Sequence, residues 1–182
     1  MLTLALTLLT DPNATPNPTL QARGLGPNSA LLVATCMRAN TALRFLDLSC
    51  NELGPHGAAS LGEALQGNTV LTTLRLASNG LGREGGIALA EGLRSNHALA
   101  TLDLSANHLL EVAALAAVLP TTRIVELNLM QNRIGDRGCA ALCAVLYHTR
   151  ELYAYPYSYP YPYPCPCPYP SQGAARDAHR AA

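Results

Sequence analysis

At 182 residues, the chain is long enough for one sizeable hydrophobic core and short for two. Its 12 basic residues balance 12 acidic residues, so no net charge attracts nucleic acid or an anionic membrane surface. The sequence contains no lysine, which excludes a P-loop nucleotide hydrolase, a kinase of the usual type and a Schiff-base enzyme, because each needs a lysine at its reacting centre.

The N-terminal segment, residues 1–24, opens with the apolar run MLTLALTLL and continues with DPNATPNPT. The run lacks the preceding basic residues of a signal peptide, and it is shorter than the roughly 20 apolar residues that span a bilayer. We therefore predict a cytoplasmic protein that does not bind membranes. The prolines predict that residues 10–24 form a loop that interrupts a degraded first repeat.

Residues 25–151 contain four copies of one pattern: LDLSCNELG, LRLASNGLG, LDLSANHLL and LNLMQNRIG. The residues that open successive units are separated by 28, 28, 25 and 28 positions; they are Leu43, Leu71, Leu99, Ile124 and Leu152. Such self-similarity is typical of a solenoid, in which the units stack because no unit can bury its own leucines.

Each unit combines two periodicities. Leu46 and Leu48 alternate with other residues, which predicts a strand with one buried face. Farther along, apolar residues such as Leu61 and Leu65 recur at helical spacing, and LGPNSALLVATCMRAN has the same helical pattern before the first strand. One strand and one helix in fixed order predict an α/β solenoid, with parallel strands on the concave face and helices on the convex face.

An asparagine follows the strand pattern of each unit: Asn51, Asn79, Asn107 and Asn132. Where the chain turns inward after a strand, backbone N–H and C=O groups would lack partners in the core. An amide side chain both donates and accepts hydrogen bonds, so it can satisfy its own turn and the neighbouring unit. We therefore predict that these asparagines form a stacked structural ladder.

The third unit departs from this pattern. It is three residues shorter than the others, and its HLLEV segment lacks the Leu-Gly-x-x-Gly loop of its neighbours. We expect an irregular convex side there, with Pro120 ending the helix.

The units LRFLDLSCNELGPHGAASLGEALQGN and LTTLRLASNGLGREGGIALAEGLRSN resemble leucine-rich repeats of the ribonuclease-inhibitor type. The resemblance covers Leu43 to Leu146 and implies protein recognition. Similar proteins include ribonuclease inhibitors, sensor regions of nucleotide-binding immune receptors and activators of the Ran GTPase. We predict a non-enzymatic scaffold that binds a protein partner on the concave strand face. The alternatives are a GTPase-activating protein resembling the Ran activator, and a sensor fragment of a nucleotide-binding immune-type receptor.

On the concave face, the residues that alternate with the buried leucines form rows across the strands. In the middle row Arg75 lies between Asp47 and Asp103, so its guanidinium can pair with either carboxylate. Phe45 and Met130 lie near the two ends of the face, and aromatic, methionine and arginine side chains are enriched in interfaces. The predicted partner-binding residues are Phe45, Asp47, Arg75, Asp103, Asn128 and Met130.

Other chemistry has little support in the sequence. Cys139 and Cys143 are four residues apart on a predicted helix, but they align with alanine and glycine in other units and are interpreted as small apolar residues. The histidines show no ligand spacing, and no catalytic motif accompanies them. We predict no enzymatic activity, no metal, no cofactor, and neither nucleic acid nor a small molecule as a ligand.

Residues 152–182 form a low-complexity tail, whose segment YAYPYSYPYPYPCPCPYP predicts polyproline II or disorder. The start of the tail, Leu152 to Tyr157, lies one repeat after the previous strand. We predict an edge strand there, in which Tyr155 and Tyr157 align with Leu127 and Leu129.

Overall fold

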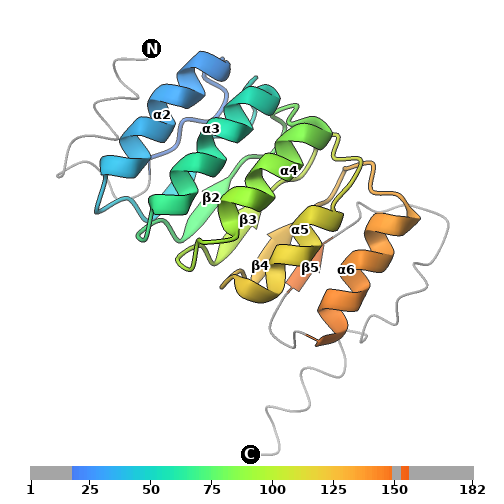
Figure 1. Ribbon diagram of the computed structural model, residues 1–182. Helices are drawn as coiled ribbons and strands as arrows, with labels where there is room; N and C mark the ends of the chain where they lie inside the picture. Colours follow the sequence, from blue (N-terminus) through green and yellow to red (C-terminus); the bar gives the residue numbers. More distant parts are fainter. Residues whose placement is uncertain (1–17, 149–152, 156–182) are drawn as a thin grey trace, which may run out of the picture.

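The structure is a computed structural model that describes residues 18–148 and 153–155. The predictions for residues 1–17 and for most of the tail lie outside the described residues. Helices and strands alternate along the chain, and the helices cover one side of a single parallel sheet (Figure 1). The sheet has the strand order β1-β2-β3-β4-β5, which is the order of the strands in the sequence. The fold is therefore the predicted α/β solenoid, with strands on the concave face and helices on the convex face.

The elements are short and regular. The strands are β1 (Phe45–Asp47), β2 (Thr73–Arg75), β3 (Thr101–Asp103), β4 (Glu126–Asn128) and β5 (Tyr153–Tyr155). The helices are α2 (Pro27–Ala39), α3 (Gly54–Gly67), α4 (Gly82–Leu93), α5 (Ala113–Val118), the 3-10 helix η1 (Leu119–Thr121) and α6 (Asp136–His148).

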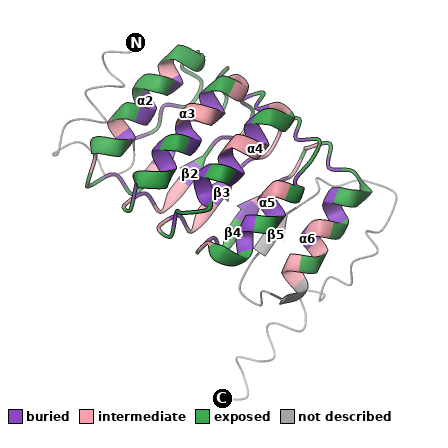
Figure 2. Ribbon diagram, viewed as in Figure 1, coloured by how far each residue is buried: buried purple, intermediate pink, exposed green. Residues whose placement is uncertain are grey.

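The hydrophobic core lies between the sheet and the helices. The buried residues, purple in Figure 2, lie on the sides of the helices and strands that face each other. Leu46 and Leu48 of the first unit are fully buried, as are Leu61 and Leu65 of the helix that follows. Because every unit repeats these positions, one continuous leucine core runs along the solenoid.

Adjacent helices make unusually close contacts at glycines. A Cβ atom added to Gly62 in α3 would lie 2.6 Å from the carbonyl oxygen of Ala88 in α4. A Cβ atom added to Gly92 would in turn overlap the backbone of Gly62. At Gly62 and Gly92 the close contact is between two helices.

The third unit is irregular, as predicted. Its helix α5 has 6 residues, whereas α3 has 14 and α4 has 12. The helix ends at Val118 and the chain continues as η1, which contains Pro120. A proline lacks the N–H needed to continue the α-helix, and this accounts for the change of hydrogen-bond pattern.

The segment before α2 lies closer to the sheet than expected. We predicted a loop over residues 10–24, but Thr19 forms a parallel bridge with Asp47, and the amide of Leu20 donates to the carbonyl of Asp47 at 2.8 Å. The amide of Ala22 also donates to the carbonyl of Ser49, at 3.0 Å. The described part of this segment, residues 18–24, therefore follows the path of a further unit beside β1.

The last strand differs from the prediction in its register. Strand β5 pairs in parallel with β4, and its Ala154 lies opposite Leu127. We had aligned Tyr155 with Leu127, so the predicted register is wrong by one residue. A shift of one residue exchanges the two faces of a strand, so the predicted alignment of tyrosines with the inward leucines does not hold.

Candidate interaction surface

The four predicted asparagines connect neighbouring units by hydrogen bonds. The side-chain amide of Asn51 donates to the carbonyl of Leu20 at 3.0 Å and to that of Leu48 at 2.7 Å. Its Oδ1 atom accepts from the amides of Arg23 and Leu25, both at 3.0 Å. One side chain thus satisfies the backbone of its own turn and of the preceding unit.

The same arrangement recurs along the solenoid. The amides of Asn79, Asn107 and Asn132 each donate to a carbonyl of the preceding unit: Leu48, Leu76 and Leu104 respectively. The Oδ1 atoms of Asn107 and Asn132 accept from backbone amides in that unit. The Oδ1 atom of Asn79 is buried and has no hydrogen-bond partner among the described residues.

The residue before each asparagine has a left-handed backbone. Its φ angle is 57° at Cys50, 54° at Ser78, 54° at Ala106 and 56° at Gln131. This conformation is unfavourable for residues other than glycine. The chain must adopt it to turn inward after the strand, and the asparagine hydrogen bonds hold it there.

A second asparagine ladder was missed in the sequence. Asn68 and Asn96 end helical segments, are buried, and are 28 residues apart. The side chain of Asn96 donates to the carbonyl of Leu65 at 2.7 Å and accepts from the amide of Leu99 at 2.9 Å. Asn40, one further repeat upstream, accepts from the amide of Leu43. The recurring endings RAN, QGN and RSN were the signal that could have revealed this ladder.

The strand pairing brings the predicted binding residues into rows. Phe45 lies opposite Thr73, and the row continues through Thr101 to Glu126. The middle row runs through Asp47, Arg75, Asp103 and Asn128. These rows are those expected from the repeat, because each strand enters the sheet in the same register.

Three members of the middle row have the same local role. The Oδ1 atoms of Asp47, Asp103 and Asn128 each accept a hydrogen bond from the backbone amide two residues later, at 2.9 to 3.1 Å. Asp103 also accepts from the hydroxyl of Ser105, at 2.7 Å. These oxygens therefore help the chain to leave the strand.

Arg75 is the exception in this row, because a guanidinium cannot accept a hydrogen bond. Its side chain lies over the Phe45 ring, 5.3 Å from the centroid, and its Nη1 atom is 3.9 Å from Oδ2 of Asp47. We expected pairing with either aspartate; of the two, Asp47 makes the ion pair, while Asp103 is bonded to Ser105. The Arg75 side chain remains 51% exposed on the concave face.

The other members of the surface differ in exposure. Phe45 and Met130 are half-buried, as are Asp103 and Asn128, whereas Asp47 is buried. The structure thus brings both Phe45 and Asp47 into contact with Arg75. Met130 belongs to the unit of β4, three strands from Phe45, and forms no part of that contact.

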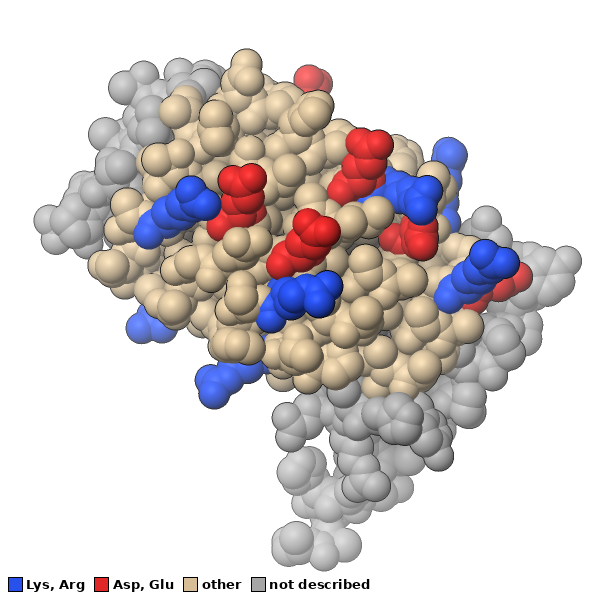
Figure 3. Space-filling model, viewed as in Figure 1, with Lys and Arg blue, Asp and Glu red and all other residues tan. Residues whose placement is uncertain are grey.

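The convex side has a mixed charge. Basic and acidic side chains are interspersed over the helical face seen in Figure 3. One pair is an ion pair between Arg83 and Glu111, with 2.6 Å between Nη2 and Oε2. A surface of this kind produces no strong field of one sign.

Among the described residues, no group of three histidine, cysteine or acidic side chains could hold a metal ion. Burial raises the pKa of the Cys36 thiol, which disfavours the reactive thiolate. Cys139 is buried in the core, in agreement with its interpretation as a small apolar residue. Cys143 is disulfide-bonded, which the same interpretation did not anticipate. No helix within the described ranges has the length and apolar character needed to cross a bilayer.

The stacked strand–helix units and their asparagine ladders define an α/β solenoid of leucine-rich repeats. The leucine-rich repeat family model matches residues 39–62, 67–90 and 124–143, and the unmatched stretch between 90 and 124 contains the shortened third unit. The chain is similar to a solved structure of leiomodin-1 actin-binding site 2, with a TM-score of 0.56 and 16% sequence identity over 88% of this chain and 78% of that chain. This similarity shows a common fold. No curated protein matches the chain.

Proposed function

We propose that the protein is a non-enzymatic scaffold that binds another protein on its concave strand face, and that its repeats are of the ribonuclease-inhibitor type. The observation that carries the proposal is the position of Arg75. At this row position the other units have a side chain that bonds to its own backbone, whereas Arg75 extends over Phe45 and stays half-exposed. Arginine and aromatic side chains are the types most enriched at binding hot spots.

The neighbouring residues have supporting roles in this proposal. Asp47 is buried beside the guanidinium and orients Arg75. Asp103 and Asn128 continue the row and offer half-exposed polar edges to a partner, and Met130 offers an apolar contact. The steps of 28 residues from Phe45 to Thr73 and from Thr73 to Thr101 support the assignment to the ribonuclease-inhibitor type.

Affinity capture followed by mass spectrometry tests this proposal. The parent protein would be compared with Phe45→Ala and Arg75→Ala, and with Arg137→Ala, which removes an exposed arginine from the helix α6. We expect the two strand-face variants to lose a captured protein that the parent and Arg137→Ala retain. Thermal melts would establish that all variants fold. If the folded strand-face variants keep every partner of the parent, the concave face is not the binding site.

Two defined ligands deserve direct measurement. Because the similar leiomodin-1 structure is described as an actin-binding site, purified actin is one ligand for a titration. A GTPase-activating role is tested by single-turnover GTP hydrolysis on a Ran-type GTPase, with and without the protein. If the protein accelerates GTP hydrolysis, its function is regulatory and the scaffold proposal is wrong. If actin binds and the binding depends on Arg75, actin is the partner of the scaffold.

A further inference from the structure

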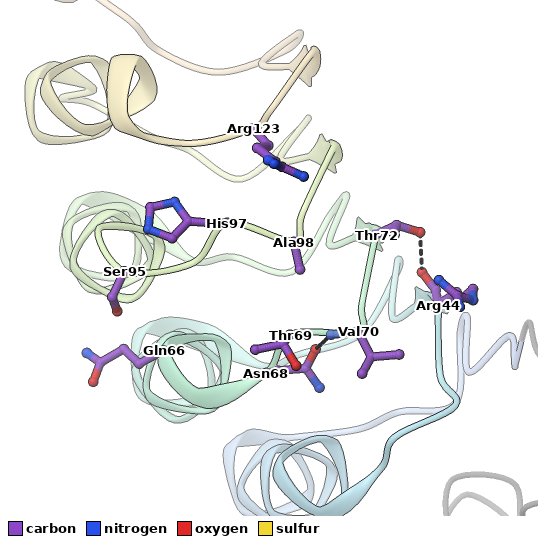
Figure 4. Close-up of a pocket in the computed structure, with 10 residues that line it drawn as sticks. All are labelled: Arg44, Gln66, Asn68, Thr69, Val70, Thr72, Ser95, His97, Ala98 and Arg123. Atoms are coloured by element: carbon purple, nitrogen blue, oxygen red, sulfur yellow. Dashed lines mark hydrogen bonds between the residues drawn. The ribbon is translucent and has the colours of Figure 1, made fainter.

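A polar groove lies along one edge of the solenoid, where the chain passes from each helix to the next strand. Its volume is about 340 Å³, and it is lined by the segments that lead into β1, β2, β3 and β4. Figure 4 shows side chains from these segments around it, with Arg123 at the top of the view and Arg44 at the right beside Thr72. The groove contains none of the residues predicted to bind a partner on the concave face.

The floor of this groove is held in place by the second asparagine ladder. The side-chain amide of Asn68 donates to the carbonyl of Met37 at 2.7 Å, and its Oδ1 atom accepts from the amides of Val70 and Leu71. The carbonyl of Arg44 accepts from the amide of Thr72 at 2.8 Å. The loops that carry the lining side chains are therefore fixed before any ligand binds, which lowers the entropy lost on binding.

The charge of the groove is uncompensated. Arg44 and Arg123 are exposed, and within the described part of the chain neither guanidinium makes an ion pair or a hydrogen bond. The lining contains no carboxylate. Other polar side chains of the lining, among them Gln66, Ser95 and His97, can donate hydrogen bonds. This combination of positive charge and hydrogen-bond donors complements a negatively charged ligand.

We propose that the groove binds an acidic, extended segment of a partner protein, whose carboxylates pair with Arg44 and Arg123. Arg44 precedes β1 and Arg123 precedes β4, which are three strand steps apart, roughly 14 Å at about 4.8 Å per step. An extended peptide advances about 3.3 Å per residue, so carboxylates about four residues apart match this distance and lie on the same side of the peptide. The groove is thus a second interaction surface, separate from the concave face.

Titration of the full-length protein with a synthetic peptide tests the inference. The peptide repeats Glu-Gly-Ser-Gly, so that its carboxylates recur every fourth residue, and its control has glutamine in place of glutamate. Binding is followed by NMR through the backbone amide chemical shifts of the isotope-labelled protein. These shifts detect weak binding and show which residues lie at the binding site. We expect the glutamate peptide to shift the amides of Thr72 and Ala98, more strongly at low salt because ionic strength screens exposed charges. The glutamine peptide should shift them much less.

Arg44→Gln and Arg123→Gln should each weaken binding by about threefold, which corresponds to an exposed ion pair. Arg137→Gln makes the same change of net charge on α6 and should leave binding unchanged. Absence of binding, equal binding of the glutamine peptide, or equal effects of all three variants would overturn the proposal. So would tighter, arginine-dependent binding of a single-stranded oligonucleotide, because the groove would then serve nucleic acid. Thermal melts establish that each variant is folded.

Discussion

Arg75 lies over the ring of Phe45 on the neighbouring strand, with 5.3 Å between its guanidinium carbon and the ring centroid. A cation–π contact at an exposed site contributes about 0.5–1 kcal/mol. The ion pair joins the half-exposed Arg75 to the buried Asp47 at 3.9 Å, and a long pair with one partner in water contributes on the order of 1 kcal/mol. These contacts orient the arginine without adding much to the stability of the fold. The side chain can therefore exchange them for contacts with a partner at small cost.

Arg75→Asn should separate binding from stability. The asparagine oxygen can accept from the amide of Ala77, as Asn128 does from the amide of Met130 at 3.1 Å. A hydrogen bond of this kind contributes about 0.5–1.5 kcal/mol, which offsets the lost ion pair and ring contact. We expect an unfolding free energy equal to or above that of the parent in urea denaturation, together with weaker capture of the partner. A marked loss of stability would show that Arg75 is mainly structural.

Asn107→Ala should be strongly destabilising. Asn107 is fully buried, and its side chain bonds the carbonyls of Leu76 and Leu104 and the amide of Asn79. Removing it leaves several buried polar groups without partners, at about 1–3 kcal/mol for each, so we expect a loss of at least about 3 kcal/mol. Urea denaturation measures the change. Asn128→Ala is the control, because Asn128 is half-buried and should cost about 1 kcal/mol.

Gly62→Ala should destabilise the contact between α3 and α4. The new methyl group would lie 2.6 Å from the carbonyl oxygen of Ala88, so the two helices must move apart. Overpacking of this kind costs about 1–3 kcal/mol. Gly67→Ala is a matched control in the same helix, since a Cβ atom there meets nothing within 4 Å. Thermal melts should show a lower Tm for Gly62→Ala and an unchanged or higher Tm for Gly67→Ala, and the opposite order would contradict this packing.

Ala106→Gly should stabilise the protein. Ala106 has a φ angle of 54°, a conformation that costs an alanine about 1–2 kcal/mol and costs glycine almost nothing. Glycine loses more backbone entropy on folding, so the expected net gain is a few tenths to about 1 kcal/mol. The backbone hydrogen bond from Ala106 to Met130 does not depend on the side chain. A decrease in the melting temperature would show that the methyl group contributes more packing than its half-buried position suggests.

Hydrogen exchange should show local opening at the third unit. Its α-helix is the shortest of those described, with 6 residues, and it continues into a 3-10 helix with weaker hydrogen-bond geometry. Because each unit is stabilised by its neighbours, a short helix weakens both of its interfaces. We expect the amides of residues 113–119 and of Thr121 to exchange faster than the internal amides of α3. Slower exchange in α5 than in α3 would contradict this expectation.

Much of the fold was predictable from the sequence because the repeat imposes it. A leucine pattern with a period of two followed by one at helical spacing specifies a strand and a helix, and repetition specifies parallel stacking. The rows through Phe45 and Arg75 follow from the same arithmetic, since each strand enters the sheet at an equivalent residue. The first asparagine ladder was predictable too, because a chain that turns into the core must satisfy its backbone groups.

The sequence did not reveal features that depend on contacts between units. A repeat alignment places Arg75 equally between two aspartates, whereas in the structure Asp47 forms the ion pair and Asp103 accepts a hydrogen bond from the hydroxyl of Ser105. The β5 register differs by one residue from the repeat, because pairing with the β4 backbone and not sequence spacing sets the position of an edge strand. The basic groove appears when Arg44 and Arg123, 79 positions apart in the sequence, border the same loops. The periodicity of the sequence thus determined which residues share a face. Only the tertiary structure decided which of those neighbours bond to each other, because several acceptors lie within reach of each donor.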